Sequence, residues 1–202
     1  MTAFAGELPR AELDDIIQRA LREDLASGDI TTNSCVEADR RVEGQAIARH
    51  EMVVCGGEIF ARVFALVDPE VVVELAVADG ELAHAGQAIW RVRGLARSVL
   101  AGERVALNLT QRLTGIASQA RRYVAELTAG STTRITDTRK TTPGLRLIER
   151  YAVRVGGAHN HRDNLGSAVM IKDNHIIAAG SISAAIGRAK RRAPHASRIE
   201  CT

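Results

Sequence analysis

The 202-residue chain contains few aromatic residues and few cysteines. Aromatic residues make up 3% of it, too few for the stacking platforms that bind single-stranded nucleic acid. The three cysteines, Cys35, Cys55 and Cys201, lie far apart without a CxxC pair, so they predict neither a disulfide framework nor a zinc site. A reducing cytoplasm is therefore the expected compartment.

Long apolar runs are also missing from the sequence. No stretch approaches the roughly 20 unbroken apolar residues of a membrane span. Residues 1–10 lack the basic segment and apolar run that mark a signal peptide, so we expect no membrane association. The remaining composition, 46% hydrophobic and 25% charged, is typical of a globular protein with a sizeable core.

Charge is unevenly divided between the two halves, although the net charge is only +3. Residues 1–100 carry 10 Lys and Arg against 17 Asp and Glu, which gives −7. Residues 101–202 carry 17 against 7, which gives +10. A basic half is typical of a region that meets anions, and a solvated basic surface is the alternative interpretation.

Hydrophobic periodicity predicts an α+β unit in the first hundred residues. Apolar residues recur at helical spacing over residues 8–25, and residues 29–32 are expected to form a loop. Alternating patterns predict strands, and one apolar stretch between them predicts a short helix. The predicted strands are 41–49, 71–78 and 87–93, and the predicted helix is 57–66.

The second half predicts a long helix followed by alternating strands and helices. The long helix covers residues 109–127. Alternation of strands and helices indicates βαβ units with parallel pairing. The predicted strands are 134–138, 167–171 and 197–201, and the predicted helices are 143–152 and 181–193, with Ser181 as N-cap. Three such strands would form an open parallel sheet with an exposed edge.

Polar side chains follow two of these predicted strands at the point where each ends. Residues 139–142 read Arg-Lys-Thr-Thr, and residues 172–175 read Lys-Asp-Asn-His. Ligands of parallel α/β folds bind at the carboxyl ends of strands, so we expect both groups on one side of the sheet. Two of the chain's three lysines, Lys140 and Lys172, lie there. Lysine and arginine at such positions favour a small polyanion as ligand.

A glycine-rich and then polar loop over residues 156–164 separates the two groups. His159 and His161 alternate and have no obvious third partner, which disfavours a metal site. A substrate-binding loop is the preferred interpretation, and a loop whose polar groups only satisfy one another is the alternative.

Six motifs follow one another in the second half of the chain: AGERVALN at 101–108, TGIAS at 114–118, DTRKTTPGLR at 137–146, YAVRVGG at 151–157, NHR at 160–162 and IKDNH at 171–175. In this order and spacing they resemble the quinolinate phosphoribosyltransferase family of type II phosphoribosyltransferases, also called carboxylating nicotinate-nucleotide pyrophosphorylases. EDLASGDITT at 23–32 also resembles the N-terminal signature of this family. The resemblance implies an N-terminal α/β sandwich domain over residues 1–110. An incomplete open (β/α) barrel would follow over residues 111–202, so the implied fold class combines α/β and α+β.

The family's reaction joins quinolinate to phosphoribosyl pyrophosphate with Mg²⁺ and gives nicotinate mononucleotide, pyrophosphate and CO₂ in NAD biosynthesis. The resemblance implies catalytic roles near the donor and the pyridine ring for Lys140 and Lys172, which would also bind substrate. It implies that Arg104 reaches quinolinate in the neighbouring subunit's site, within a homodimer or a hexamer of dimers that shares active sites. The other implied substrate-binding residues are Thr138, Arg139, His161 and Arg162. No residue is assigned as a metal ligand.

The sequence departs from the family pattern after Glu200. The family has a further acidic residue two positions on, then more strands and two glycine-rich phosphate loops, whereas Thr202 is the last residue here. We therefore expect a C-terminally truncated chain that is inactive or prone to aggregate by itself.

Three other interpretations stay open at this stage. One is a paralogous phosphoribosyltransferase-like protein that uses another substrate. A second is a fragment that only dimerises, through residues 1–130. A third is a nucleic-acid-binding module, suggested by the basic run of Arg188, Lys190, Arg191 and Arg192, although a solvated helix end is the preferred explanation of that run. The family resemblance implies small-molecule substrates and no nucleic acid partner.

Overall fold

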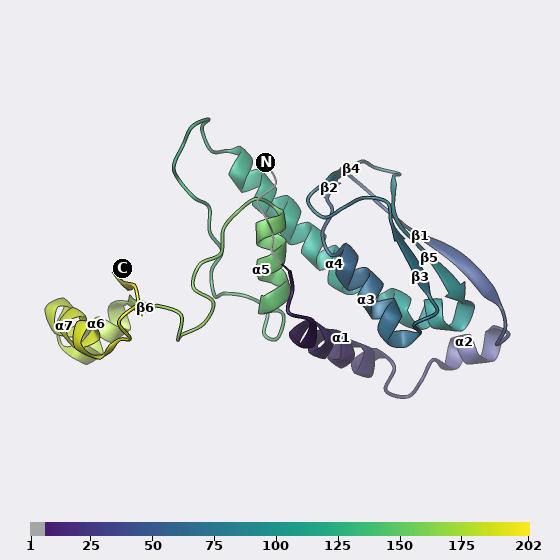
Figure 1. Cartoon of the computed structure of the whole chain (residues 1–202), viewed down its shortest axis with the longest axis horizontal. Coiled ribbons are helices and arrows are strands. Elements are labelled where there is room, and N and C mark those ends of the chain that lie inside the picture. Colours follow the sequence, from purple (N-terminus) through teal and green to yellow (C-terminus); the bar gives the residue numbers. More distant parts are fainter. Residues whose placement is uncertain (1–6) are drawn as a thin grey trace. The chain divides into compact units, whose positions relative to one another are not determined.

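A computed structural model describes residues 7–202 and divides them between two compact units (Figure 1). Unit 1 runs to Asp137 and resumes over Thr141–His159, and unit 2 consists of Thr138–Lys140 and Asn160–Thr202. The chain therefore passes between the units three times. Residues 1–6, on which part of the predicted N-terminal domain and of the signal-peptide argument rests, lie outside the described residues.

The first helices of unit 1 illustrate one confirmed and one wrong prediction. Helix α1 (Arg10–Asp24) buries the predicted apolar stripe, including Leu13 and Ile17. The expected loop at 29–32 instead opens helix α2 (Ile30–Cys35). Its N-cap explains the difference, because the Asp29 side chain accepts a 2.9 Å hydrogen bond from the Thr32 N–H and so satisfies an otherwise unpaired helix donor.

A three-stranded antiparallel sheet follows, in the order β1 (Arg41–Ile47), β5 (Ala88–Leu95), β3 (Val72–Leu75). The strands at 41–49 and 87–93 are confirmed. Strand β3 is shorter than predicted, and its apolar residues are half exposed because it lies at the sheet edge, with Val72 47% and Leu75 46% exposed. Two short strands that periodicity did not predict, β2 (Met52–Val53) and β4 (Leu82–Ala83), pair antiparallel.

Helices α3 (Gly57–Val67) and α4 (Ala96–Ala125) pack against each other and against this sheet (Figure 1). The aromatic core joins them to the sheet, since the ring centroids of Phe60 and Trp90 lie 4.7 Å apart. Gly102 permits the close approach of the helices, because a Cβ there would lie 2.9 Å from the Phe64 ring. The predicted helix at 57–66 is confirmed.

Helix α4 begins at Ala96, well before the predicted start at residue 109. The expected domain boundary between residues 110 and 111 falls inside this 30-residue helix, and that boundary stays a prediction. Helix α5 (Arg146–Val155) packs on α4. A Cβ at Gly156, which follows α5, would lie 2.5 Å from the Ala117 carbonyl oxygen, so only glycine fits this contact.

The predicted strand at 134–138 is wrong, because this segment makes a single parallel bridge between Thr136 and His159. The Asp137 N–H donates to the His159 carbonyl at 3.0 Å, and the His159 N–H donates to the Ile135 carbonyl at 2.9 Å. The ladder extends no further, so the expected three-stranded parallel sheet is also wrong.

Unit 2 is a small βαβ structure. Strand β6 (Val169–Ile171) pairs in parallel with β7 (Ile199–Cys201), and helix α7 (Ile182–Arg192) connects them. The Ser181 hydroxyl accepts from the Ala184 N–H at 3.1 Å, which confirms the predicted N-cap. A further short helix, α6 (Asp173–Ala179), follows β6 where the sequence predicted only a polar strand end.

Within residues 7–202, no helix is both long enough and apolar enough to cross a membrane.

Candidate functional site

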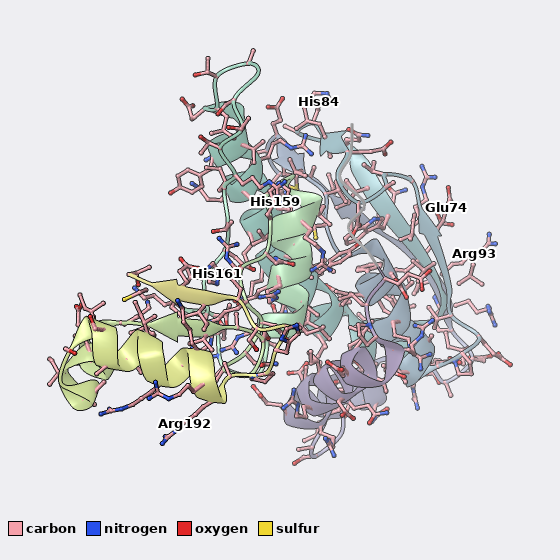
Figure 2. All side chains as sticks on the ribbon, turned by 60° about the vertical axis from the view of Figure 1, so that its left-hand side comes forward. Glu74, His84, Arg93, His159, His161 and Arg192 are labelled. Atoms are coloured by element: carbon pink, nitrogen blue, oxygen red, sulfur yellow. The ribbon has the colours of Figure 1, made fainter. Side chains whose placement is uncertain are left out.

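Unit 2 contains six of the seven residues to which the sequence assigned a role. They come from three separate stretches of the chain: residues 138–140, residues 161–162 and residue 172. The first two stretches lie immediately after a point where the chain leaves unit 1. Figure 2 labels His159, the last residue of unit 1 before the third passage, and His161 just beyond it. The six residues are Thr138, Arg139, Lys140, His161, Arg162 and Lys172.

The first stretch is a tight turn of three residues. The Thr138 hydroxyl accepts a 3.1 Å hydrogen bond from the Lys140 N–H, so the threonine side chain sets the local backbone conformation. Thr138 and Lys140 are exposed, while Arg139 is half-buried. The turn therefore presents the Lys140 ammonium to solvent, where an anionic ligand can reach it.

His161 and Arg162 are oriented by backbone groups of their own unit. Nδ1 of His161 accepts from the Arg162 N–H at 2.7 Å, so in a neutral imidazole the proton lies on Nε2. One guanidinium nitrogen of Arg162, Nη1, donates to the Ala168 carbonyl at 2.9 Å, just before β6. That bond holds the planar guanidinium group in place, and such a group can also bind a carboxylate bidentately.

Lys172 lies at the carboxyl end of β6, where ligands of parallel α/β folds bind. Its backbone N–H donates to Nδ1 of His175 at 3.0 Å, which turns the chain from β6 into α6. The Lys172 side chain is exposed. The turn thus separates two roles: the backbone is held by His175, and the ammonium group is accessible.

A cavity of about 350 Å³ lies within unit 2. Its polar lining is Arg162, His175 and Arg188, and its apolar lining includes the strand β6. Sequence reasoning gave no ligand role to His175, although it belongs to the IKDNH motif. Sequence reasoning placed Arg188 only in the basic run of α7, because helical periodicity does not show which of these cations faces strand β6. The end of that run points away from the ribbon, as Arg192 does in Figure 2.

Arg104 does not belong to unit 2. It is an exposed residue of α4, which belongs to unit 1. Among residues 7–202, no group of three or more His, Cys, Asp or Glu side chains could hold a metal ion.

Unit 1 holds a partly buried polar cluster around Asp79 that the sequence did not reveal. Its carboxylate accepts from the N–H groups of Gly56 at 2.7 Å and Gly57 at 2.9 Å, at the N-terminus of α3, and from the Tyr151 hydroxyl at 2.8 Å. Gly56 has φ 103°, a left-handed conformation that glycine adopts without strain. Burial raises the pKa of Tyr151 well above its ordinary value, and the Asp79 charge adds to that shift.

Comparison with known protein families matches both parts of the chain. Residues 29–114 match the family described as quinolinate phosphoribosyl transferase, N-terminal domain, and residues 116–202 match its C-terminal domain. A probable carboxylating nicotinate-nucleotide pyrophosphorylase of Bacillus subtilis is 42% identical over 189 residues, which cover 94% of this chain and 65% of that protein. The decarboxylating quinolinate phosphoribosyltransferase 1b of Nicotiana tabacum is 41% identical over 88% of this chain and 50% of its own length.

Solved structures agree with these matches. The crystal structure of NadC from Streptococcus pyogenes has a TM-score of 0.91 and 43% identity, and the match covers 97% of this chain and 69% of that one. The predicted mixed α/β fold class is thereby confirmed, and among the described residues the sheets do not close into a barrel. The chain therefore has the two-part α/β fold of these structures, and it belongs to the quinolinate phosphoribosyl transferase family. It spans half to two thirds of the length of the two curated relatives named above.

Proposed function

We propose that the protein transfers the phosphoribosyl group of phosphoribosyl pyrophosphate to quinolinate, with loss of CO₂, in NAD biosynthesis. The products are nicotinate mononucleotide and pyrophosphate. One observation carries the proposal: the cationic residues Arg139, Lys140, Arg162 and Lys172 come from three stretches of the chain and fall in one compact unit. Both substrates are polyanions, and guanidinium and ammonium groups are the side chains that bind carboxylates and phosphates best.

The assigned roles follow the charges of the substrates. Arg139, His161 and Arg162 hold the two carboxylates of quinolinate, and Thr138 donates a hydrogen bond to bound substrate. Lys140 and Lys172 act as catalytic cations near the donor and the pyridine ring. Departing pyrophosphate gathers negative charge while the ribose becomes oxocarbenium-like, and fixed cations stabilise that charge. After transfer, the positive ring nitrogen accepts the electrons that decarboxylation releases.

Mg²⁺ belongs to this proposal as part of the donor substrate, because it binds the pyrophosphate oxygens of phosphoribosyl pyrophosphate. Shared sites in a homodimer, or in a hexamer of dimers, give Arg104 its role, because its exposed side chain would contact quinolinate bound to a second subunit. A cytoplasmic location is supported by two exposed free thiols, Cys35 and Cys201, a state that a reducing compartment maintains.

Calorimetric titration with quinolinate, followed by an assay of nicotinate mononucleotide formation, tests the proposal. We expect saturable binding that weakens as salt is added, and weaker binding of nicotinate, which has one carboxylate to pair. Binding of nicotinate or another anion in preference to quinolinate would favour the paralogous protein. Quinolinate binding without product would identify the chain as the inactive fragment. Absence of any pyridine carboxylate binding would contradict the proposal.

A further inference from the structure

Helix α5 holds one end of the turn that carries Thr138, Arg139 and Lys140 through a buried carboxylate. Glu149 is only 6% exposed. Its Oε2 accepts from the Thr142 N–H at 3.1 Å, and its Oε1 accepts from Nε of Arg112, on α4, at 2.7 Å. Arg112 also donates to the Thr142 hydroxyl. The chain is thus bound just after it returns to unit 1.

The next residue of α5 holds the other end. Nη1 of Arg150 lies 3.8 Å from Oδ2 of Asp137, and the two side chains are 14% and 7% exposed. Asp137 is the last residue of unit 1 before the turn, and its N–H also donates to the His159 carbonyl. Two consecutive residues, Glu149 and Arg150, therefore bind the chain on either side of residues 138–141.

Helix α5 is a rigid base for these two contacts. Ile148 and Ala152 are fully buried in the core, and the glycine contact with α4 closes its carboxyl end. The Tyr151 hydroxyl bonds to Asp79, which is itself bonded to the N-terminus of α3. Glu149, Arg150 and Tyr151 thus make polar contacts in different directions. The Tyr151 contact holds α5 in place, and Glu149 and Arg150 bind the ends of the turn from this helix.

The chemistry of the contacts also points to positioning. Burying a charge is costly, and well-packed apolar residues often stabilise a fold as well as a buried ion pair does. The charged hydrogen bonds of Glu149 instead fix a particular geometry, and the ion pair of Arg150 with Asp137 adds charge attraction at the other end. At both ends of the turn the contact binds backbone or a side chain of the segment directly adjoining the predicted substrate residues.

We propose that Glu149 and Arg150 are positioning residues, which set the geometry of the substrate-binding turn at 138–140 without touching substrate. This inference rests on the proposed function for its consequence, but the anchoring itself can be measured without any ligand. Release of either end should leave the fold intact and increase the freedom of the turn, so that Arg139 and Lys140 bind their ligand less well.

Hydrogen exchange by mass spectrometry of peptides covering residues 137–145 tests the anchoring. The variants are Glu149→Ala and Arg150→Ala, with Glu149→Gln and Arg150→Lys as conservative partners. We expect exchange in these peptides to be about tenfold faster in the alanine variants, since Glu149→Ala removes a hydrogen bond to a charged group and Arg150→Ala removes a buried ion pair with Asp137. Arg150→Lys keeps a cation facing Asp137 and should restore slow exchange. Glu149→Gln keeps an acceptor for Thr142 and guards against an alanine variant that fails to fold.

Asp14→Asn is the matched control, because it breaks a two-bond ion pair with Arg62 between α1 and α3 in which no residue of 137–145 takes part. It should lower stability without changing exchange at residues 137–145. Unchanged exchange in both alanine variants, or equal acceleration in Asp14→Asn, would overturn the inference. So would a Lys variant that behaves like Ala at position 150.

Quinolinate titration of the same variants separates this inference from the proposed function. We expect affinity to fall about tenfold in the alanine variants and to recover to within about threefold in Arg150→Lys. Faster exchange in the alanine variants, combined with no quinolinate binding by the unmodified protein, would support the anchoring and contradict the proposed substrate. Quinolinate binding by the unmodified protein, together with unchanged exchange in the alanine variants, would support the proposed substrate and contradict the anchoring.

Discussion

The Tyr151 hydroxyl lies 2.8 Å from Oδ2 of Asp79, so that one hydrogen bond joins helix α5 to the carboxylate at the N-terminus of α3. The two residues are 72 positions apart in the sequence. The bond therefore connects the sheet-bearing part of unit 1 with the helix that precedes the second candidate site segment.

Tyr151→Phe should destabilise unit 1 by about 1 kcal/mol, the usual net value of one hydrogen bond. Asp79→Ala should cost more, since it leaves two backbone N–H groups and the tyrosine hydroxyl without their acceptor. Urea unfolding of each variant measures both effects. Tyr123→Phe is the control, because Tyr123 is 58% exposed and its loss of a hydroxyl should change stability by less than about 0.5 kcal/mol. Equal effects of the two tyrosine substitutions would contradict this.

The three thiols should react at two distinct rates. Cys35 and Cys201 are exposed, whereas Cys55 is fully buried. Burial raises the pKa of the Cys55 thiol well above its ordinary value, with Asp79 adding to the shift, so little of the reactive thiolate is present near neutral pH. Alkylation followed by mass spectrometry should modify Cys35 and Cys201 quickly and Cys55 only as the protein unfolds. Rapid modification of Cys55 in the folded protein would contradict the burial.

The ion pair of Asp14 with Arg62 should make stability depend on acid pH. Its two bonds are both 2.7 Å, and the hydrogen bond from Arg62 is the main cause that lowers the pKa of Asp14. A lowered folded-state pKa stabilises the fold above the unfolded value of about 4, and this contribution disappears as pH falls through the folded-state pKa. Asp14→Asn should therefore be less stable than the unmodified protein at neutral pH, and the difference should vanish in acid. Asp15→Asn, at an exposed neighbour, should show no such pH-dependent difference.

Arg139→Ala and Arg162→Ala should each weaken quinolinate binding severely. Each would leave a carboxylate of the bound dianion unpaired, and removing one partner of a buried charge pair costs roughly 3–5 kcal/mol. Isothermal titration measures the change, with Arg192→Ala at the exposed end of α7 as the control. A loss of affinity below about threefold, which is under 1 kcal/mol, would contradict the carboxylate assignment.

Shared sites predict complementation between subunits. Arg104→Ala and Lys172→Ala should each abolish quinolinate binding in a dimer, since one removes the donated residue and the other the resident one. In verified mixed dimers, one site regains both residues, so binding should return at about half the normal stoichiometry. No recovery in such mixed dimers would argue against a role for Arg104 across subunits.

Local sequence patterns predicted part of this fold correctly. The apolar stripe of α1 and the Ser181 cap of α7 act within a few residues, and both were predicted correctly. Helix α2 was missed because its polar sequence has no periodicity, and the Asp29 cap supports it instead. The segment at 134–138 has strand-like composition but pairs only once, with His159, because ladder formation depends on partners distant in sequence.

The candidate site shows the same division. The motifs identified Lys140 and Lys172, and the structure places both in unit 2. Neither Glu149 nor Arg150 could be recognised from sequence, since their partners Thr142 and Asp137 become neighbours only after α5 has packed on α4. Whether a helical charge faces solvent or another segment of the chain is decided by tertiary contacts, and helical periodicity alone leaves that choice open.

The triple passage of the chain between the two units limits how the protein can be divided. Unit 2 needs residues 138–140 as well as residues 160–202, and helix α5 lies between these stretches in the sequence. No single cut in the gene separates the two units, so a recombinant piece or a swapped module that begins after α5 loses the turn bearing Lys140. We therefore expect that the site does not move between proteins as one separate module. Substitutions in α5 should be tolerated better when the turn changes with them than when they occur alone.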